Sequence, residues 1–143
     1  RALTLGLRAL SGNSAYDIAL YREAARYRYD VYHAHDLPAL IPAYLAARKH
    51  GSYLFYDAHE LYPEIGTLTA RQKRELGRVE ARSISQCDRV ITVNPLIAEE
   101  MARRYHISQP KVILNAVTVP AGFRPTIKED RFRLHLATMS LQR

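Results

Sequence analysis

Apolar residues follow two patterns, and segments with one pattern alternate along the chain with segments that have the other. Short continuous apolar runs, typical of buried strands, are followed by stretches with the helical spacing of three to four residues. The strands are predicted over residues 30–35, 53–56, 89–93 and 111–114. The helices are predicted over residues 14–29, 36–50, 69–86 and 95–105. This alternation predicts an α/β fold, with a parallel sheet covered by helices on both faces.

Capping residues support these boundaries. Asp36 followed by Pro38, and Asn94 followed by Pro95, each combine a capping side chain with a proline in the first helical turn. Gly51, after His50, is typical of a helix C-terminus. Asp36 therefore has a structural interpretation, as a helix cap, beside any functional one.

Polar residues follow the predicted strands at their carboxyl ends, where open α/β sheets bind their ligands. The residues expected along this edge are His35, Asp36, His59, Glu60, Asn94 and Asn115. The first two strand ends each join an imidazole to a carboxylate, a pair suited to general base catalysis because the carboxylate orients the ring. We favour a functional role for His59, since an imidazole at the start of a long loop has little structural purpose.

The same strand ends also suggest a metal site. Alternation along a strand places His33 and His35 on one side, and Asp57 and His59 add further ligand types. The later strand ends offer only asparagines, which leaves the ligand set short. We therefore predict no metal, and a metal-dependent hydrolase fragment built on these four residues stays as an alternative.

Four arginines share one face of the helix predicted over residues 69–86, namely Arg71, Arg74, Arg78 and Arg82. The favoured interpretation is a solvated face of an amphipathic helix. The alternative is a contact with anionic lipid headgroups. Glu80 lies on the apolar side of this helix, so we expect it to be partly buried and paired with an arginine.

Composition limits the classes of function. The chain has 143 residues, about one domain, and 21 basic against 14 acidic residues give a net charge of +7, which suits an anionic partner. Its mixed tyrosines and arginines follow helical spacing and it has no glycine-rich phosphate loop, so nucleic-acid binding is not predicted. The single cysteine, Cys87, fits a reducing compartment, and no apolar run approaches the roughly 18 residues of a membrane span.

Four segments carry a family resemblance: DVYHAHD at residues 30–36, YDAHELYPE at 56–64, CDRVITVN at 87–94 and KVILNAV at 111–117. In this order they resemble the N-terminal, acceptor-side domain of family 4 glycosyltransferases, which have the GT-B fold of two facing Rossmann-like domains. The resemblance covers residues 15–120. It implies that residues 1–117 form a partial Rossmann-like domain, and that residues 118–143 are a linker and the start of a donor-binding domain.

The resemblance also implies a function. Family members transfer a sugar from a nucleotide-sugar to an acceptor with retention, and need no cofactor and no obligatory metal. His59 matches the position near the transferred sugar and is the implied catalytic residue, and the implied substrate-binding residues are His35, Asp36, Glu60 and Asn94.

The expected partners and setting follow from the same resemblance. The acceptor is a glycan or a lipid-linked molecule, as in polysaccharide biosynthesis, and the protein is expected to be cytoplasmic, with peripheral contact at the inner face of the membrane. The chain alone is expected to be inactive, because the family's donor domain would lie beyond it. A non-catalytic module that binds a sugar or a lipid headgroup is the alternative from another class.

Overall fold

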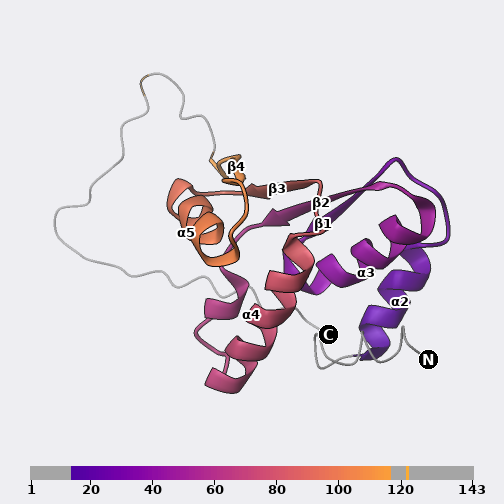
Figure 1. The fold of residues 1–143 in the computed structure, drawn as a ribbon, viewed down its shortest axis with the longest axis horizontal. Helices are drawn as coiled ribbons and strands as arrows, with labels where there is room; N and C mark the ends of the chain where they lie inside the picture. Colours follow the sequence, from indigo (N-terminus) through magenta and orange to yellow (C-terminus); the bar gives the residue numbers. More distant parts are fainter. Residues whose placement is uncertain (1–13, 117–121, 123–143) are drawn as a thin grey trace.

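A computed structural model describes residues 14–116 and Gly122, which contain a four-stranded parallel sheet with helices packed against it (Figure 1). The strands are β1 (Val31–His35), β2 (Tyr53–Ala58), β3 (Arg89–Thr92) and β4 (Lys111–Val112). They lie in the order β1-β2-β3-β4, so each connection leads to the neighbouring strand. The predicted α/β, Rossmann-like fold is confirmed.

Helices occupy the connections between the strands. They are α2 (Ser14–Ala24), α3 (Asp36–His50), the 3-10 helix η1 (Tyr62–Glu64), α4 (Ala70–Ile84) and α5 (Pro95–Tyr105). The ends of α3 and α4 fall close to the prediction because local residues set them. Thr69 and Gln72 form a capping box before α4, and Gly51 ends α3 in the left-handed conformation with φ 66°.

The helix predicted over residues 14–29 ends at Ala24 instead. Two carbonyl groups beyond that point are bound by side chains from later in the chain. The Ala25 carbonyl accepts a hydrogen bond from Lys49 Nζ at 2.9 Å and lies 3.1 Å from His50 Nε2. The Tyr32 hydroxyl donates to the Tyr27 carbonyl at 2.8 Å. Tertiary contacts therefore override the helical pattern here.

Two strand ends also differ from the prediction. β2 continues past residue 56 to Ala58, so Asp57 lies inside the strand rather than after it. β4 stops at Val112 instead of residue 114, and Ile113 and Leu114 are exposed. The extension of β2 is the consequential difference, because it places the Asp57 side chain on a face of the sheet.

The described helices pack on one face of the sheet, as the ribbon shows (Figure 1). Tyr32, Leu54 and Tyr56 point into this core and are buried with Leu40 of α3 and Ile84 of α4. The alternate strand residues point the other way and are exposed or half-buried. The sequence predicted helices on both faces, but α2, α3, α4 and α5 all pack on the first face (Figure 1). Within residues 14–116 the second face is therefore open.

Glu80 lies in the core with a different partner from the one predicted. It is completely buried, and its Oε1 and Oε2 each accept a 2.6 Å hydrogen bond, from the hydroxyls of Tyr56 and Tyr105. The expected arginine partner is thus replaced by two tyrosines, which approach from β2 and α5. Burial raises the pKa of the Glu80 carboxyl, although both hydroxyls favour its charged form.

None of the described helices is long and apolar enough to cross a membrane.

Candidate functional site

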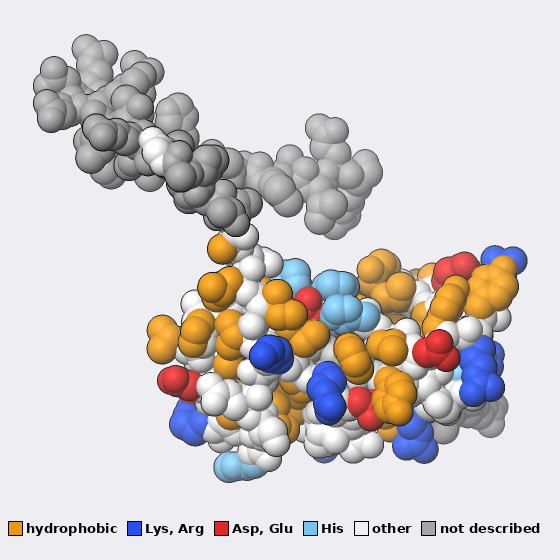
Figure 2. All heavy atoms as spheres, turned by 90° about the horizontal axis from the view of Figure 1, so that it is seen from above, with side chains coloured by type: hydrophobic (Ala, Val, Ile, Leu, Met, Phe, Trp, Pro, Cys, Tyr) orange, Lys and Arg blue, Asp and Glu red, His pale blue; other side chains and the backbone are white. Residues whose placement is uncertain are grey.

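The ends of β1 and β2 bring four titratable side chains together on the open face of the sheet. Parallel pairing sets His35 opposite Asp57, with His33 two residues earlier on β1 and His59 just beyond β2. Histidine side chains gather on this face in Figure 2. The His33, His35 and His59 side chains are 40%, 60% and 40% exposed, whereas Asp57 is only 16% exposed. We call these four residues the histidine cluster.

The Asp57 carboxylate lies at the centre of the histidine cluster. Its Oδ2 is 3.4 Å from His59 Nε2, 3.5 Å from His35 Nδ1 and 3.7 Å from His33 Nε2. The His33 and His35 rings stack with centroids 4.5 Å apart, and His35 meets His59 edge to face at 5.6 Å. One carboxylate oxygen is therefore shared by three imidazoles.

Asp36 does not cap its own helix, so the capping interpretation was wrong. The N-cap position of α3 belongs to His35, and Asp36 follows with φ 57°, in the left-handed region that Asp tolerates better than most residues. This sharp turn directs its carboxylate toward the neighbouring strand, where Oδ1 accepts a 3.0 Å hydrogen bond from the backbone N–H of His59. Asp36 thus fixes the backbone that carries His59.

Glu60 and Tyr62 extend the site along the loop after β2. Burial is the main cause that raises the pKa of the half-buried Tyr62 hydroxyl, and the negative charges of Asp36 and Glu60 raise it further. Sequence reasoning did not select Tyr62, because a single aromatic residue in a loop has no periodic signal. Its place in the motif after His59 was the only available indication.

Asn94 lies beyond β3 and has the predicted capping role. Its Oδ1 accepts a hydrogen bond from the Leu96 backbone N–H at 2.8 Å, and Pro95 occupies the first turn of α5. Asn94 and Asn115 are both exposed. The Asn94 oxygen is engaged by its own helix. The predicted role of Asn94 in substrate binding stays a prediction.

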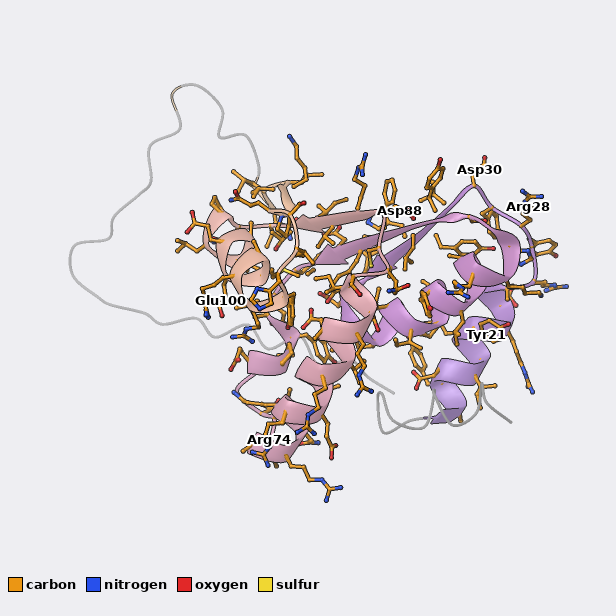
Figure 3. All side chains as sticks on the ribbon, viewed as in Figure 1. Tyr21, Arg28, Asp30, Arg74, Asp88 and Glu100 are labelled. Carbon is orange, nitrogen blue, oxygen red and sulfur yellow. The ribbon has the colours of Figure 1, made fainter. Side chains whose placement is uncertain are left out.

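The arginine face of α4 is separate from the histidine cluster. All four arginines, Arg71, Arg74, Arg78 and Arg82, are exposed. Arg71 Nε pairs with Glu75 Oε1 at 2.8 Å, an exposed interaction within the same helix. In Figure 3 the labelled Arg74 lies at the end of α4 farthest from the sheet. The two features therefore cannot contact the same small ligand.

The parallel sheet, with polar residues at the carboxyl ends of adjacent strands, makes this an α/β domain of the open-sheet class, in which ligands bind at that edge. Residues 2–119 match the family described as Glycosyltransferase Family 4, and the chain belongs to this family. The resemblance drawn from the four motifs is confirmed. No curated protein matches the chain.

Proposed function

We propose that this chain is the acceptor-side domain of a retaining glycosyltransferase. The enzyme would move a sugar from a nucleotide-sugar to a glycan or a lipid-linked acceptor, for polysaccharide biosynthesis. Residues 1–117 would form this domain, and residues 118–143 would lead into a donor-binding domain. Family membership supports a transferase, and the observation that carries the proposal is the position of His59, held by Asp36 beside Asp57.

His59 is the proposed catalytic residue. Departure of the nucleoside diphosphate leaves positive, oxocarbenium-like character on the sugar, and the acceptor hydroxyl must be oriented toward that centre. An exposed imidazole next to a carboxylate can hydrogen-bond to the sugar or polarise the acceptor hydroxyl. Asp57 Oδ2, 3.4 Å from His59 Nε2, would orient the ring toward the substrates.

The neighbouring polar residues would bind the substrates. His35 and Glu60 are exposed near His59, and the Asp36 carboxylate also faces this region. Asn94 is proposed to contact the acceptor from the end of β3. We propose that transfer needs no cofactor and no obligatory metal, because basic residues of a donor domain would neutralise the leaving diphosphate.

The two alternative functions are a metal-dependent hydrolase fragment and a non-catalytic binding module. Family membership favours a transferase over the metal-dependent hydrolase fragment. A non-catalytic binding module makes an opposite experimental prediction, since it would bind a sugar or headgroup and leave the donor intact.

The test replaces His59 with alanine in the full-length enzyme that contains this chain. A panel of nucleotide-sugars is screened with glycan and lipid-linked acceptors, and transfer is followed by mass spectrometry. We expect His59→Ala to lower kcat by about 100-fold or more, the usual contribution of a positioned acid or base. The melting temperature should change little, because the side chain is 40% exposed.

His106→Asn is the matched control. His106 is exposed at the end of α5 with φ 52°, a conformation that asparagine also accepts. Near-normal turnover of His59→Ala would refute the role of His59. Sugar transfer by the 143-residue chain alone would refute the need for a donor domain.

We also propose that the arginine face of α4 contacts anionic lipid at the inner face of the membrane. All four of its arginines are exposed, and α4 packs on the face of the sheet opposite the histidine cluster (Figure 1). Such a contact would hold the enzyme where lipid-linked acceptors are found.

A further inference from the structure

The histidine cluster has the residue pattern H-x-H on β1 and D-x-H on β2 and just beyond it. In register, His35 lies directly across from Asp57, and alternation keeps His33 on the same face. The cluster thus draws its ligand atoms from two adjacent, hydrogen-bonded strands. This removes the objection raised by the asparagines on the later strands, because no ligand from those strands is needed.

The spacing of the ligand atoms is close to that of a coordination sphere. One ligand atom each from His33, His35 and Asp57 lies within 4.8 Å of the other two. Asp57 Oδ2 is 3.5 and 3.7 Å from the nearest nitrogens of His35 and His33. Bonds of about 2.0–2.1 Å to a tetrahedral zinc ion would set its ligand atoms about 3.3 Å apart. Small rotations of exposed side chains would close the difference.

Hydrogen bonding explains this arrangement less well. A charge-assisted hydrogen bond between an imidazole and a carboxylate is about 2.7–2.9 Å long. All three histidine nitrogens lie 3.4–3.7 Å from the same Asp57 oxygen, beyond that length. A small cation that bonds to His33, His35 and Asp57 would account for their approach without such hydrogen bonds.

Neighbouring residues restrict parts of the histidine cluster, and two of its side chains are open to solvent. Phe55 contacts the His33 ring edge to face at 6.3 Å between centroids, which limits the rotation of that ring. The backbone of His59 is fixed by Asp36. The side chains of His33 and His35 are 40% and 60% exposed, so an ion can reach them directly from solvent.

We propose that His33, His35 and Asp57 form a binding site for a divalent transition-metal ion. Two imidazoles with one carboxylate suit Zn²⁺ and Co²⁺, whereas Mg²⁺ and Ca²⁺ prefer oxygen ligands. The site goes beyond the proposed sugar transfer and does not depend on it. A bound ion would tie the ends of β1 and β2 together.

The test titrates Zn²⁺ into the purified 143-residue chain by calorimetry. We expect saturable binding of one equivalent in the micromolar range, and visible absorption from the same site when Co²⁺ is used. His33→Asn and His35→Asn should each weaken binding at least tenfold. His106→Asn and His135→Asn, which alter histidines away from the cluster in the sequence, should bind as the original chain does.

A second measurement needs no variant, and so does not depend on how any substitution folds. Zinc should shift the ring resonances of His33 and His35 in nitrogen-15 NMR spectra and leave those of His106 unchanged. The proposal is overturned if no one-equivalent binding occurs, if His33→Asn and His35→Asn bind zinc normally, or if the shifted rings belong to other histidines. None of these results would bear on sugar transfer by the full-length enzyme.

Discussion

The Asp36 carboxylate accepts a 3.0 Å hydrogen bond from the backbone N–H of His59, and so joins the start of α3 to the residue that follows β2. Asp36 makes this contact from the left-handed region, at φ 57°. A residue held in such a conformation is retained where the surrounding structure needs it. Asp36 is therefore a positioning residue for His59 under the proposed function.

We expect Asp36→Ala to lower kcat of the full-length enzyme by about tenfold to 100-fold, because small displacements of a reacting group are costly. Asp36→Asn should keep most of the activity, since asparagine tolerates the left-handed region and offers an oxygen acceptor. Steady-state kinetics and thermal unfolding of both variants make the test. Equal loss in the two variants, or wild-type kcat in Asp36→Ala, would count against positioning by this bond.

The buried Glu80 should make Tyr56 and Tyr105 important for stability. Tyr56→Phe removes a 2.6 Å hydrogen bond to a fully buried carboxyl, and we expect it to lower the free energy of unfolding by about 1.5–3 kcal/mol. Tyr53→Phe is the matched control, because Tyr53 is 62% exposed and should show almost no effect. Urea unfolding followed by circular dichroism gives both values. Equal stability of the two variants would contradict the role of the hydroxyl.

Glu80 should also make the free energy of unfolding fall as the pH rises above 4.5. Burial raises the pKa of its carboxyl in the folded state above the ordinary 4.5. The unfolded chain therefore loses this proton first as the pH rises, and the contribution of Glu80 to stability falls between pH 4.5 and the higher folded-state pKa. Glu80→Gln, which cannot titrate, should remove this fall. The measurement compares the free energies of unfolding of the two chains across that range, and parallel profiles would refute the assignment.

The sequence predicted the elements whose ends depend on neighbouring residues. The capping box at Thr69 and the glycine at residue 51 both act within one helical turn, so α4 and α3 were placed nearly correctly. The contact of Asp36 with His59 joins residues 23 positions apart, and the tyrosines of Glu80 come from β2 and α5. Such pairings depend on the strand register, which periodicity in one segment cannot reveal.

The arginine face of α4 should bind anionic vesicles because its arginines lie together on one helix face, and not only because the chain has a positive net charge. We expect the double variant Arg74→Gln/Arg78→Gln to bind phosphatidylglycerol vesicles about 25-fold more weakly, since each surface arginine contributes about fivefold. Arg22→Gln/Arg28→Gln removes the same charge, and Figure 3 shows Arg28 far from Arg74. Vesicle flotation at low salt makes the comparison, and neutral vesicles should bind neither chain. An equal loss of vesicle affinity in the two double variants would show that net charge alone causes the binding.

Cys87 should react slowly with alkylating reagents in the folded chain. Burial, and to a smaller extent the charge of Asp88, raises the pKa of its thiol to about 12, and the thiol lies 3.5 Å from the Ser83 carbonyl oxygen. Because the thiolate is the reactive form, iodoacetamide at pH 8 should modify Cys87 at least tenfold more slowly than it modifies the urea-unfolded chain. Mass spectrometry at timed intervals measures both rates. Similar rates in the folded and unfolded chains would show that the thiol is accessible and ionised, contrary to its half-buried position after the end of α4.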